Sequence, residues 1–451
     1  MIEDDLKAIE ASVASIRAQL PSNLARVSTT EDLQKAVDDF TIKTILVKPG
    51  LYGTLTLRNG VRGVTIRPDT ILGEGRVSND WKESLIKLAQ LDCEPKAESY
   101  YLNGFQFLPR TDPGYPIINL GTDKETNPLN TPNNIWFNQC IISADPTKGG
   151  KRGMALNCRI VYVMHSLLEN FKYSSDSQAI QAQNGPGPHT INDCYLSASG
   201  ENFLLGGADP TNELMIPSNL TFTNNLCTKD MTWMGMAGVT SKNCFELKNI
   251  IGAIIENNIF ENSWTSGQTG YLVVFTPRNQ GGSAPFTVVR DVDFRWNVMR
   301  NGGAGINMIG DDNVNPSQRT ENITIEQNLM YDIGTLPGAQ RLNMIGRNPL
   351  NVNYRNNTMI GVKVNSFLDF EMGAENFSAL NNYFSEGSYG LKGTYTGSVT
   401  GNIIGPPVAP RLIKYEPGNV KTTLPLGPDY KYQQDPSKGC DIDELRRRVK
   451  F

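Results

Sequence analysis

Ile323-Thr324-Ile325-Glu326-Gln327-Asn328 is one of ten short stretches that alternate apolar and polar residues and end at a fixed polar position. Val352-Asn353-Tyr354-Arg355-Asn356-Asn357 is another. The fixed positions lie 20 to 39 residues apart and are Cys140, Ser166, Cys194, Asn225, Asn258, Asn297, Asn328, Asn357, Asn382 and Asn402. Alternation is typical of strands, and asparagine suits a tight bend because its side chain hydrogen-bonds the backbone and tolerates unusual dihedral angles. Units that recur at such a period predict an all-β solenoid whose stacked coils place these amides above one another.

The composition is that of a soluble, mildly acidic protein. The chain has 451 residues, 39% hydrophobic residues and a net charge of −4. Such a length is large for one core, but a solenoid grows lengthwise. No basic patch predicts a nucleic-acid partner, and no apolar run of about 18 residues predicts a membrane span. The seven cysteines lack metal-type spacing, so we expect reduced thiols, with Cys140 and Cys194 packed inside.

The first 22 residues predict a separate helix. Its apolar positions are spaced as a heptad seam and are Ile2, Leu6, Ile9, Val13, Ile16 and Leu20. Three heptads are too few for a stable isolated coiled coil, so the helix needs partners or a host groove. Isoleucine and valine in the seam favour a trimer. The alternative is a helix that lies on its own body. The acidic start Met1–Asp5 argues against a signal peptide.

The remaining chain divides into three predicted regions. Residues 29–100 comprise a capping helix at Thr30–Phe40, early strands within Thr44–Pro68, and a helix-like insertion at 78–100. Residues 101–405 form the repeats, interrupted by a proline- and asparagine-rich loop at 109–133. Residues 406–451 form an extended tail with a possible short helix at Asp441–Val449. An amphipathic helix before the first coil would cover the open apolar end of the solenoid.

Several segments resemble known proteins. The helix followed by Thr44–Gly50 and Tyr52-Gly53 resembles the opening of pectate-lyase-like right-handed parallel β-helices. Other segments resemble bacterial β-helix-repeat proteins of unassigned activity, namely Asp176–Ile180, Asn184–Pro188, Gly200–Asn202, Gly207–Pro210, Phe245–Asn249 and Arg278–Gln280. The resemblance covers roughly residues 29–450 and implies a three-sheeted parallel solenoid, often one that acts on or binds polysaccharide. The heptad helix looks more like the assembly segment of a phage tailspike or virion appendage.

Each coil contributes a second strand, and these strands carry the candidate site. Examples are Asn202–Leu205, Phe245–Lys248, Tyr271–Phe275, Ile306–Ile309, Leu342–Ile345 and Phe367–Glu371. Alternation places Glu246, Asn307 and Asn343 outward, beside Asp369 and the polar loops that follow. The catalytic candidates are Glu201, Asp209, Glu246 and Asp311, and the substrate-binding candidates are Gln178, Lys248, Arg278, Asn279, Asn307, Asn343 and Arg347. The alternative is that these residues are solvated or structurally paired.

Such a strip suits an extended sugar chain. Carboxylates accept hydroxyl hydrogens, arginines hold uronate carboxylates, and rings such as Trp233 or Trp264 stack on sugars. Hydrolysis needs two carboxyl groups, whereas a lyase needs a base near a cation that stabilises the enolate. Gly310-Asp311-Asp312 is similar to one polygalacturonase motif, but the accompanying histidine motif and the Trp-Ile-Asp-His signature of pectate lyases have no counterpart. No cofactor is predicted, since the spacing of Asp311, Asp312 and Asn313 matches no calcium loop.

The sequence therefore favours a virion protein of tailspike or appendage type, made in the host cytoplasm. In this interpretation the body binds surface polysaccharide, and the N-terminal helix makes a homo-oligomer or docks to other virion proteins. The alternative is a bacterial polysaccharide lyase or glycoside hydrolase, cytoplasmic or exported by a non-classical route. A third hypothesis is a non-catalytic cellular scaffold whose loops bind proteins.

Overall fold

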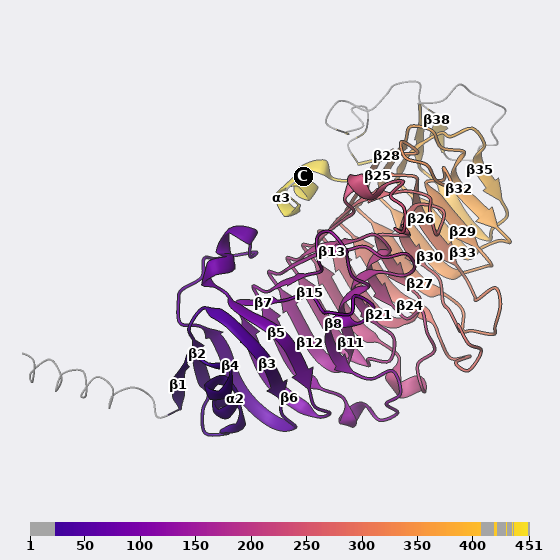
Figure 1. The fold of residues 1–451 in the computed structure, drawn as a ribbon. Coiled ribbons are helices and arrows are strands. Elements are labelled where there is room, and N and C mark those ends of the chain that lie inside the picture. The colour runs from indigo at the N-terminus through magenta and orange to yellow at the C-terminus, as the bar shows by residue number, and fades with distance from the viewer. Residues whose placement is uncertain (1–22, 407–418, 422–429, 431–434, 436, 450–451) are drawn as a thin grey trace, which may run out of the picture.

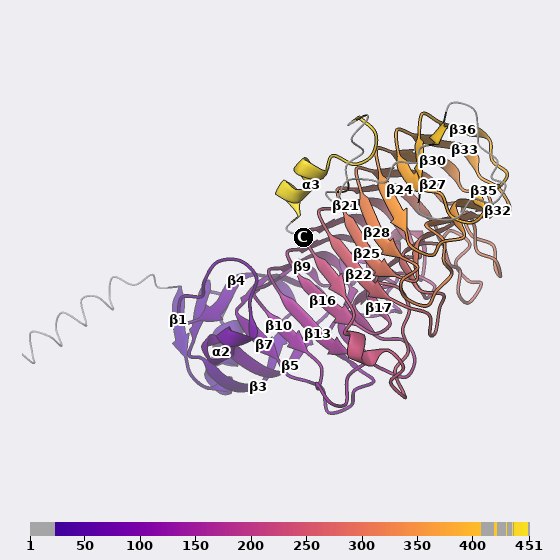
Figure 2. The same ribbon diagram turned by 90° about the horizontal axis from the view of Figure 1, so that it is seen from above.

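The chain winds into a right-handed parallel β-helix of three sheets, which confirms the predicted fold class (Figures 1 and 2). The computed structural model describes residues 23–406, 419–421, 430, 435 and 437–449. The predicted heptad helix at 1–22 and most of the predicted extended tail lie outside these residues. Within these described residues, sheets A and B have 14 strands each and sheet C has 10.

Each coil contributes one strand to each sheet over most of the rod. Sheet A contains β1 (Leu24–Val27), β2 (Thr44–Val47), β4 (Gly60–Pro68), β6 (Ala97–Asn103), β9 (Asn133–Asn138), β12 (Arg159–Met164), β15 (Gly187–Asn192), β18 (Ser218–Thr223), β21 (Ile250–Glu256), β24 (Val289–Arg295), β27 (Glu321–Glu326), β30 (Leu350–Arg355), β33 (Glu375–Leu380) and β36 (Gly397–Thr400). Sheet B contains β3 (Gly50–Leu57), β5 (Ile86–Cys93), β7 (Phe105–Phe107), β10 (Ile141–Ser143), β13 (Leu167–Phe171), β16 (Tyr195–Ala198), β19 (Leu226–Thr228), β22 (Ile259–Ser263), β25 (Val298–Gly302), β28 (Leu329–Ile333), β31 (Thr358–Gly361), β34 (Tyr383–Ser385), β37 (Ile403–Gly405) and β38 (Val420–Lys421).

Sheet C carries the predicted second strands. It contains β8 (Pro116–Gly121), β11 (Arg152–Asn157), β14 (Gln178–Ala182), β17 (Glu201–Leu205), β20 (Phe245–Leu247), β23 (Tyr271–Phe275), β26 (Ala304–Ile309), β29 (Asn343–Gly346), β32 (Ser366–Glu371) and β35 (Gly390–Gly393). The helices in the described part of the chain are α2 (Thr30–Asp38), α3 (Ile442–Arg448) and the short 3₁₀ turns η1 (Asn79–Ser84), η2 (Pro128–Asn130), η3 (Glu213–Met215) and η4 (Met231–Trp233). No helix among the described residues is long and apolar enough to cross a bilayer.

The predicted asparagine ladder runs along the bend between sheets A and B. The backbone N–H and the side-chain amide of Asn225 both donate to Oδ1 of Asn258, at 2.9 and 3.1 Å. The same pair of hydrogen bonds repeats from Asn258 through Asn402 and ends on Asn419. The donor-to-Oδ1 distances are 2.8 to 3.1 Å. The residue before each ladder position from Asn225 to Asn382 has a left-handed backbone, with φ of 51° to 59°. Each ladder amide therefore satisfies buried backbone groups that the sharp bend removes from the sheets.

Helix α2 caps the open end of the solenoid, as predicted. Its apolar face buries Leu33, Ala36 and Val37, and the Thr29 hydroxyl caps it by accepting from the N–H of Asp32 at 3.1 Å. Beneath the helix, the fully buried Arg62 donates to backbone carbonyls, including that of Val37 at 2.7 Å.

Two predicted segments are wrong. Residues 78–100 form only the turn η1 before strands β5 and β6, because Ile86 and Leu88 alternate toward the core with Lys87 outward. The predicted loop at 109–133 contains strand β8 and turn η2. The coils therefore begin well before residue 101. The predicted C-terminal helix is confirmed as α3.

Candidate functional site

A polar cleft of about 600 Å³ lies on the outward face of sheet C. Five successive coils, those of β11, β14, β17, β20 and β23, supply its lining. Because neighbouring strands are about 4.8 Å apart, five coils span about 19 Å along the rod. The lining residues are Arg152, Asp176, Gln178, Gln181, Glu201, Leu204, Gly207, Lys242, Lys248, Gln268, Arg278 and Gln280.

Glu201 is the buried carboxyl group of this cleft, with no exposed surface of its own. It is in register with Gln178 on the neighbouring strand, and its Oε2 accepts from Gln178 Nε2 at 2.9 Å. Its Oε1 lies 3.4 Å from Lys242 Nζ. Burial and the nearby Glu246 raise the pKa of Glu201, although Lys242, Lys248 and Gln178 oppose this shift. Glu201 is therefore a carboxyl group that can donate or accept a proton more readily near neutral pH than an exposed glutamate.

Three cations, Lys242, Lys248 and Arg152, surround this carboxyl group. Lys242 also pairs with Asp176, and although burial disfavours its charge, its acidic neighbours raise its pKa. Lys248 Nζ lies 3.3 Å from Oε1 of Glu246, a side chain that is only 2% exposed. Arg152 Nε donates to Gln178 Oε1 at 3.0 Å, and burial lowers the pKa of this arginine. The cleft thus presents fixed positive charges around one or two desolvated carboxyl groups.

The loop beyond β23 holds Arg278 at the end of the cleft. Arg278 Nη1 donates to Oδ1 of Asp312 at 2.6 Å, and the backbone N–H of Asn279 donates to Oδ2 of the same carboxylate at 2.8 Å. Asn279 is fully buried, and its side chain bonds the carbonyl of Pro316 and the N–H of Ala284. Asn279 therefore braces the loop and does not reach the cleft.

Two catalytic candidates are engaged in loop contacts outside the cleft. Asp209 accepts from the N–H groups of Gly281 and Ser283 and from the Ser283 hydroxyl at 2.7 Å. Burial alone would raise the pKa of Asp209, but these hydrogen bonds outweigh it and hold the pKa below its usual range. Asp311 forms an ion pair with Arg347. We infer that Asp209, Asp311 and Arg347 hold these loops in place.

The outward orientation predicted for Asn343 is wrong. Asn343 is in register with the core residue Ile306, and its Nδ2 donates to the carbonyl of Phe367 at 2.9 Å inside the coil. Asn307 does face outward, in register with Val274 and Met344, but lies beyond the cleft. The tryptophans proposed for sugar stacking, Trp233 and Trp264, are each only 3% exposed.

The structure therefore gathers Gln178, Glu201, Lys248 and Arg278 in the cleft, with Glu246 paired beside them. Sequence reasoning missed Arg152 and Lys242 as site residues. Both stand where the chain enters or approaches a sheet C strand, as Gln178 does. This shared position at or just before the start of a sheet C strand is the sequence feature from which both residues could have been predicted.

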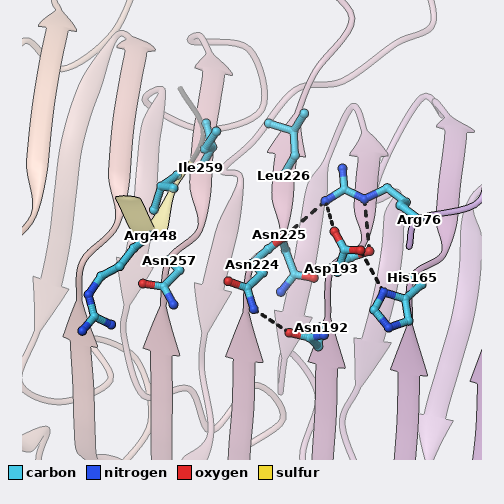
Figure 3. A pocket seen from close by; sticks show the side chains of 11 residues that line it. Arg76, His165, Asn192, Asp193, Asn224, Asn225, Leu226, Asn257, Ile259 and Arg448 are labelled. Carbon is cyan, nitrogen blue, oxygen red and sulfur yellow. Dashed lines mark hydrogen bonds and ion pairs between the residues drawn. The ribbon is translucent and has the colours of Figure 1, made fainter. Parts of the chain in front are cut away.

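A second pocket, of about 510 Å³, lies over the bend between sheets A and B (Figure 3). Asp193 accepts from Arg76 Nη2 at 2.8 Å and contacts Nδ1 of His165 at 2.8 Å. Figure 3 shows this cluster at one end of the pocket, Arg448 at the other, and amides including Asn224 between them. Arg76 belongs to the segment before η1, and Arg448 ends α3.

This second pocket is a gap in a covered apolar row on sheet B. The register aligns outward residues on successive strands, Ile141, Leu167, Tyr195, Leu226, Ile259, Val298 and Leu329. The segment around η1 covers the first three through Val77 and Leu85, and α3 covers the last two through Ile442 and Leu445. Leu226 and Ile259 line the space that remains. The Arg76–Asp193–His165 cluster thus fastens one covering segment to the coils.

No model of a known protein family matches the chain, and no curated protein matches it. Among solved structures, the chain is similar to a mannuronic acid specific polysaccharide family 6 lyase from human gut microbiota, with 13% identity and a TM-score of 0.51 over 95% of this chain and 98% of that one. It is similar to a PL6 family alginate lyase at 13% identity and a TM-score of 0.51, covering 94% of this chain and 58% of that one. A tailspike protein of an E. coli bacteriophage aligns at 12% identity and a TM-score of 0.42 over 88% of this chain and 63% of that one. Similarity at this identity shows the fold alone.

Proposed function

We propose that the chain binds an extended, uronate-bearing polysaccharide across sheet C, with the Glu201 cleft as its main contact. The observation that carries this proposal is the placement of Glu201 among Lys242, Lys248 and Arg152 in a polar cleft that crosses five coils. The cations pair with sugar carboxylates, while amides and carboxyl groups bond sugar hydroxyls. The two family 6 lyases of this fold, one of alginate and one specific for mannuronic acid, support this choice of ligand.

The binding test compares charged and neutral polymers by calorimetry. Alginate and polygalacturonate should bind, and neutral dextran should not. Lys248→Met should weaken uronate binding at least tenfold, because a buried charge-assisted contact contributes about 1.5–3 kcal/mol. The matched control is Lys87→Met on sheet B, where Lys87 pairs with Glu83 at 2.9 Å. Equal affinity for dextran, or equal loss in the control, would refute the proposal.

Cleavage in the same cleft is a second candidate function. It is favoured by two buried carboxyl groups, Glu201 and Glu246, whose charges interact and of which Glu201 has a raised pKa. A lyase would release ultraviolet-absorbing unsaturated ends, with a cleft lysine near the enolate; a hydrolase would release reducing ends only. Glu201→Gln and Glu246→Gln should each abolish turnover without abolishing binding. If the polymer binds but stays intact, the cleft binds polysaccharide without cleaving it.

We further propose that the body belongs to a tailspike or another virion appendage, attached through residues 1–22. The heptad spacing of Ile2 to Leu20 supports this assignment. Light scattering should give a trimer for the full chain and a monomer after residues 1–22 are deleted. A full chain that is already monomeric, and that is found in no viral particle, would contradict it.

A further inference from the structure

Lys229 is a buried lysine inside the solenoid, just after β19 and only 1% exposed. Its ammonium group donates to the carbonyls of Ala198 and Asn243, at 3.1 and 3.0 Å, and to that of Gly200. Oδ1 of Asn202 lies 3.4 Å away. These four oxygens occupy the three donors of an ammonium group. Within the described residues no carboxylate forms an ion pair with Lys229, so the direct contacts of its ammonium group are all to carbonyl and amide oxygens.

Two of the carbonyls that Lys229 binds, those of Gly200 and Asn243, come just before strands of sheet C that line the cleft or carry its carboxyl groups. Gly200 immediately precedes Glu201 at the start of β17. Asn243 lies on the next coil, shortly before Glu246 of β20. One ammonium group therefore joins the two strand starts that carry the buried carboxyl groups, and it does so from inside the solenoid.

Asn202 reinforces this attachment. Its side chain is fully buried inside the coil, and its Nδ2 donates to the carbonyls of Leu196 and Thr228, at 2.8 and 2.6 Å. The bend between sheets B and C is thus filled at this coil by polar groups in place of apolar ones. Such a buried network is costly unless every member is satisfied, so it fixes one backbone arrangement.

Lys229 and Glu201 also interact electrostatically across the strand. Burial lowers the pKa of Lys229, while the neighbouring acidic groups of Cys244, Glu201, Cys227 and Glu246 oppose that shift. The interaction is mutual, so a charged Lys229 favours the ionised form of Glu201. On its outward side, Glu201 is faced by Arg152, Asp176, Gln178, Lys242, Glu246 and Lys248.

We propose that Lys229 is a positioning residue of the sheet C cleft. It fixes the backbone that presents Glu201, and it places a positive charge behind this carboxyl group. The identity of the ligand in this cleft rests on the proposed function, whereas the position and ionisation of Glu201 can be tested without any ligand.

The test measures the ionisation of Glu201 by infrared difference spectra between each background and its Glu201→Gln derivative, across pH. In Lys229→Met the half-ionisation pH of Glu201 should rise, because the variant lacks the positive charge behind this carboxyl group. Lys229→Gln, which keeps a hydrogen-bond donor without the charge, should raise it in the same direction.

Arg62→Met is the matched control. Arg62 is another fully buried cation, and it donates to the carbonyls of Val37, Ile42 and Ala36 at 2.7, 2.8 and 2.9 Å beneath the capping helix. This variant should lose stability but leave the Glu201 titration unchanged.

Each outcome decides the inference. An unshifted Glu201 titration in a folded Lys229 variant overturns it, as does a shift of equal size in Arg62→Met. If neither Lys229 variant folds while Arg62→Met does, Lys229 is a folding determinant and the positioning role is rejected. If the titration shifts but neither alginate nor polygalacturonate binds the unmodified protein, the inference stands and the proposed function fails.

Discussion

The backbone N–H and the side-chain amide of Asn297 both donate to Oδ1 of Asn328, at 2.9 and 3.1 Å. Oδ1 of Asn297 in turn accepts the same pair of bonds from Asn258, and its Nδ2 also reaches the carbonyls of Ile255 and Arg295. Each asparagine is therefore both donor and acceptor in a chain of bonds parallel to the rod. Such a chain makes the bend cooperative between coils.

Asn297→Ala should destabilise the fold by about 3 kcal/mol, because it leaves buried backbone groups on two neighbouring coils without partners. Urea unfolding followed by circular dichroism measures this loss. Thr324→Ala, an outward substitution on β27 of the next coil, is the control and should change the free energy of unfolding by less than about 0.5 kcal/mol. Equal effects of the two substitutions would show that the ladder contributes little stability.

The ladder and the parallel coils were predictable because both repeat, and a repeated pattern survives errors in single residues. Asn343 was misplaced because strict alternation fails in sheet C. Adjacent residues such as Ala179 and Ile180, or Leu272 and Val273, both pack in the core. A local irregularity of this kind turns Asn343 inward beside Leu342, and alternation counted from the sequence cannot show it.

The cleft was only partly predictable for a different reason. Glu201 and Lys248 lie in or beside sheet C strands, whose positions follow from the repeat. Whether a loop residue faces the cleft depends on contacts between loops of different coils, as the bonds from Ser283 to Asp209 show. Spacing along the chain does not encode those contacts.

Acid should destabilise the protein through His189. This histidine is buried, its Nε2 donates to the carbonyl of Cys158 at 3.1 Å, and burial lowers its pKa to about 4. The unfolded chain binds a proton near pH 6.5, whereas the folded chain does not until about pH 4. The stabilisation is therefore complete above pH 6.5 and is lost as pH falls toward 4, by about 3 kcal/mol.

Comparing His189→Gln with the unmodified protein isolates this contribution, because all other titratable groups are the same in both proteins. The difference between their free energies of unfolding should shrink as pH falls from 6.5 to 4. A difference that stays constant over that range would mean that the imidazole of His189 takes up its proton as readily in the folded as in the unfolded chain.

Leu445→Ala should loosen helix α3 without unfolding the coils. Leu445 is fully buried and packs with Val298 and Leu329 on sheet B. Its truncation costs about 2–3 kcal/mol at the contact, which should speed amide exchange in α3 about 30-fold or more. Leu214→Ala, at a residue that is 69% exposed, is the matched control. Faster exchange throughout sheet B would contradict a local role.

Uronate binding in the proposed cleft should strengthen as pH falls from neutral. The pKa of Glu201 is raised by burial and by Glu246, so this group is neutralised before the ordinary carboxyl groups of a uronate polymer. Losing that negative charge makes the cleft around Lys242 and Lys248 more positive, which strengthens its attraction for the polymer. Titration calorimetry with alginate at stepped pH measures the trend. Glu201→Gln should flatten it and match the low-pH affinity at every pH, because the variant carries no charge to lose. A trend that persists in Glu201→Gln would assign the pH dependence to another group.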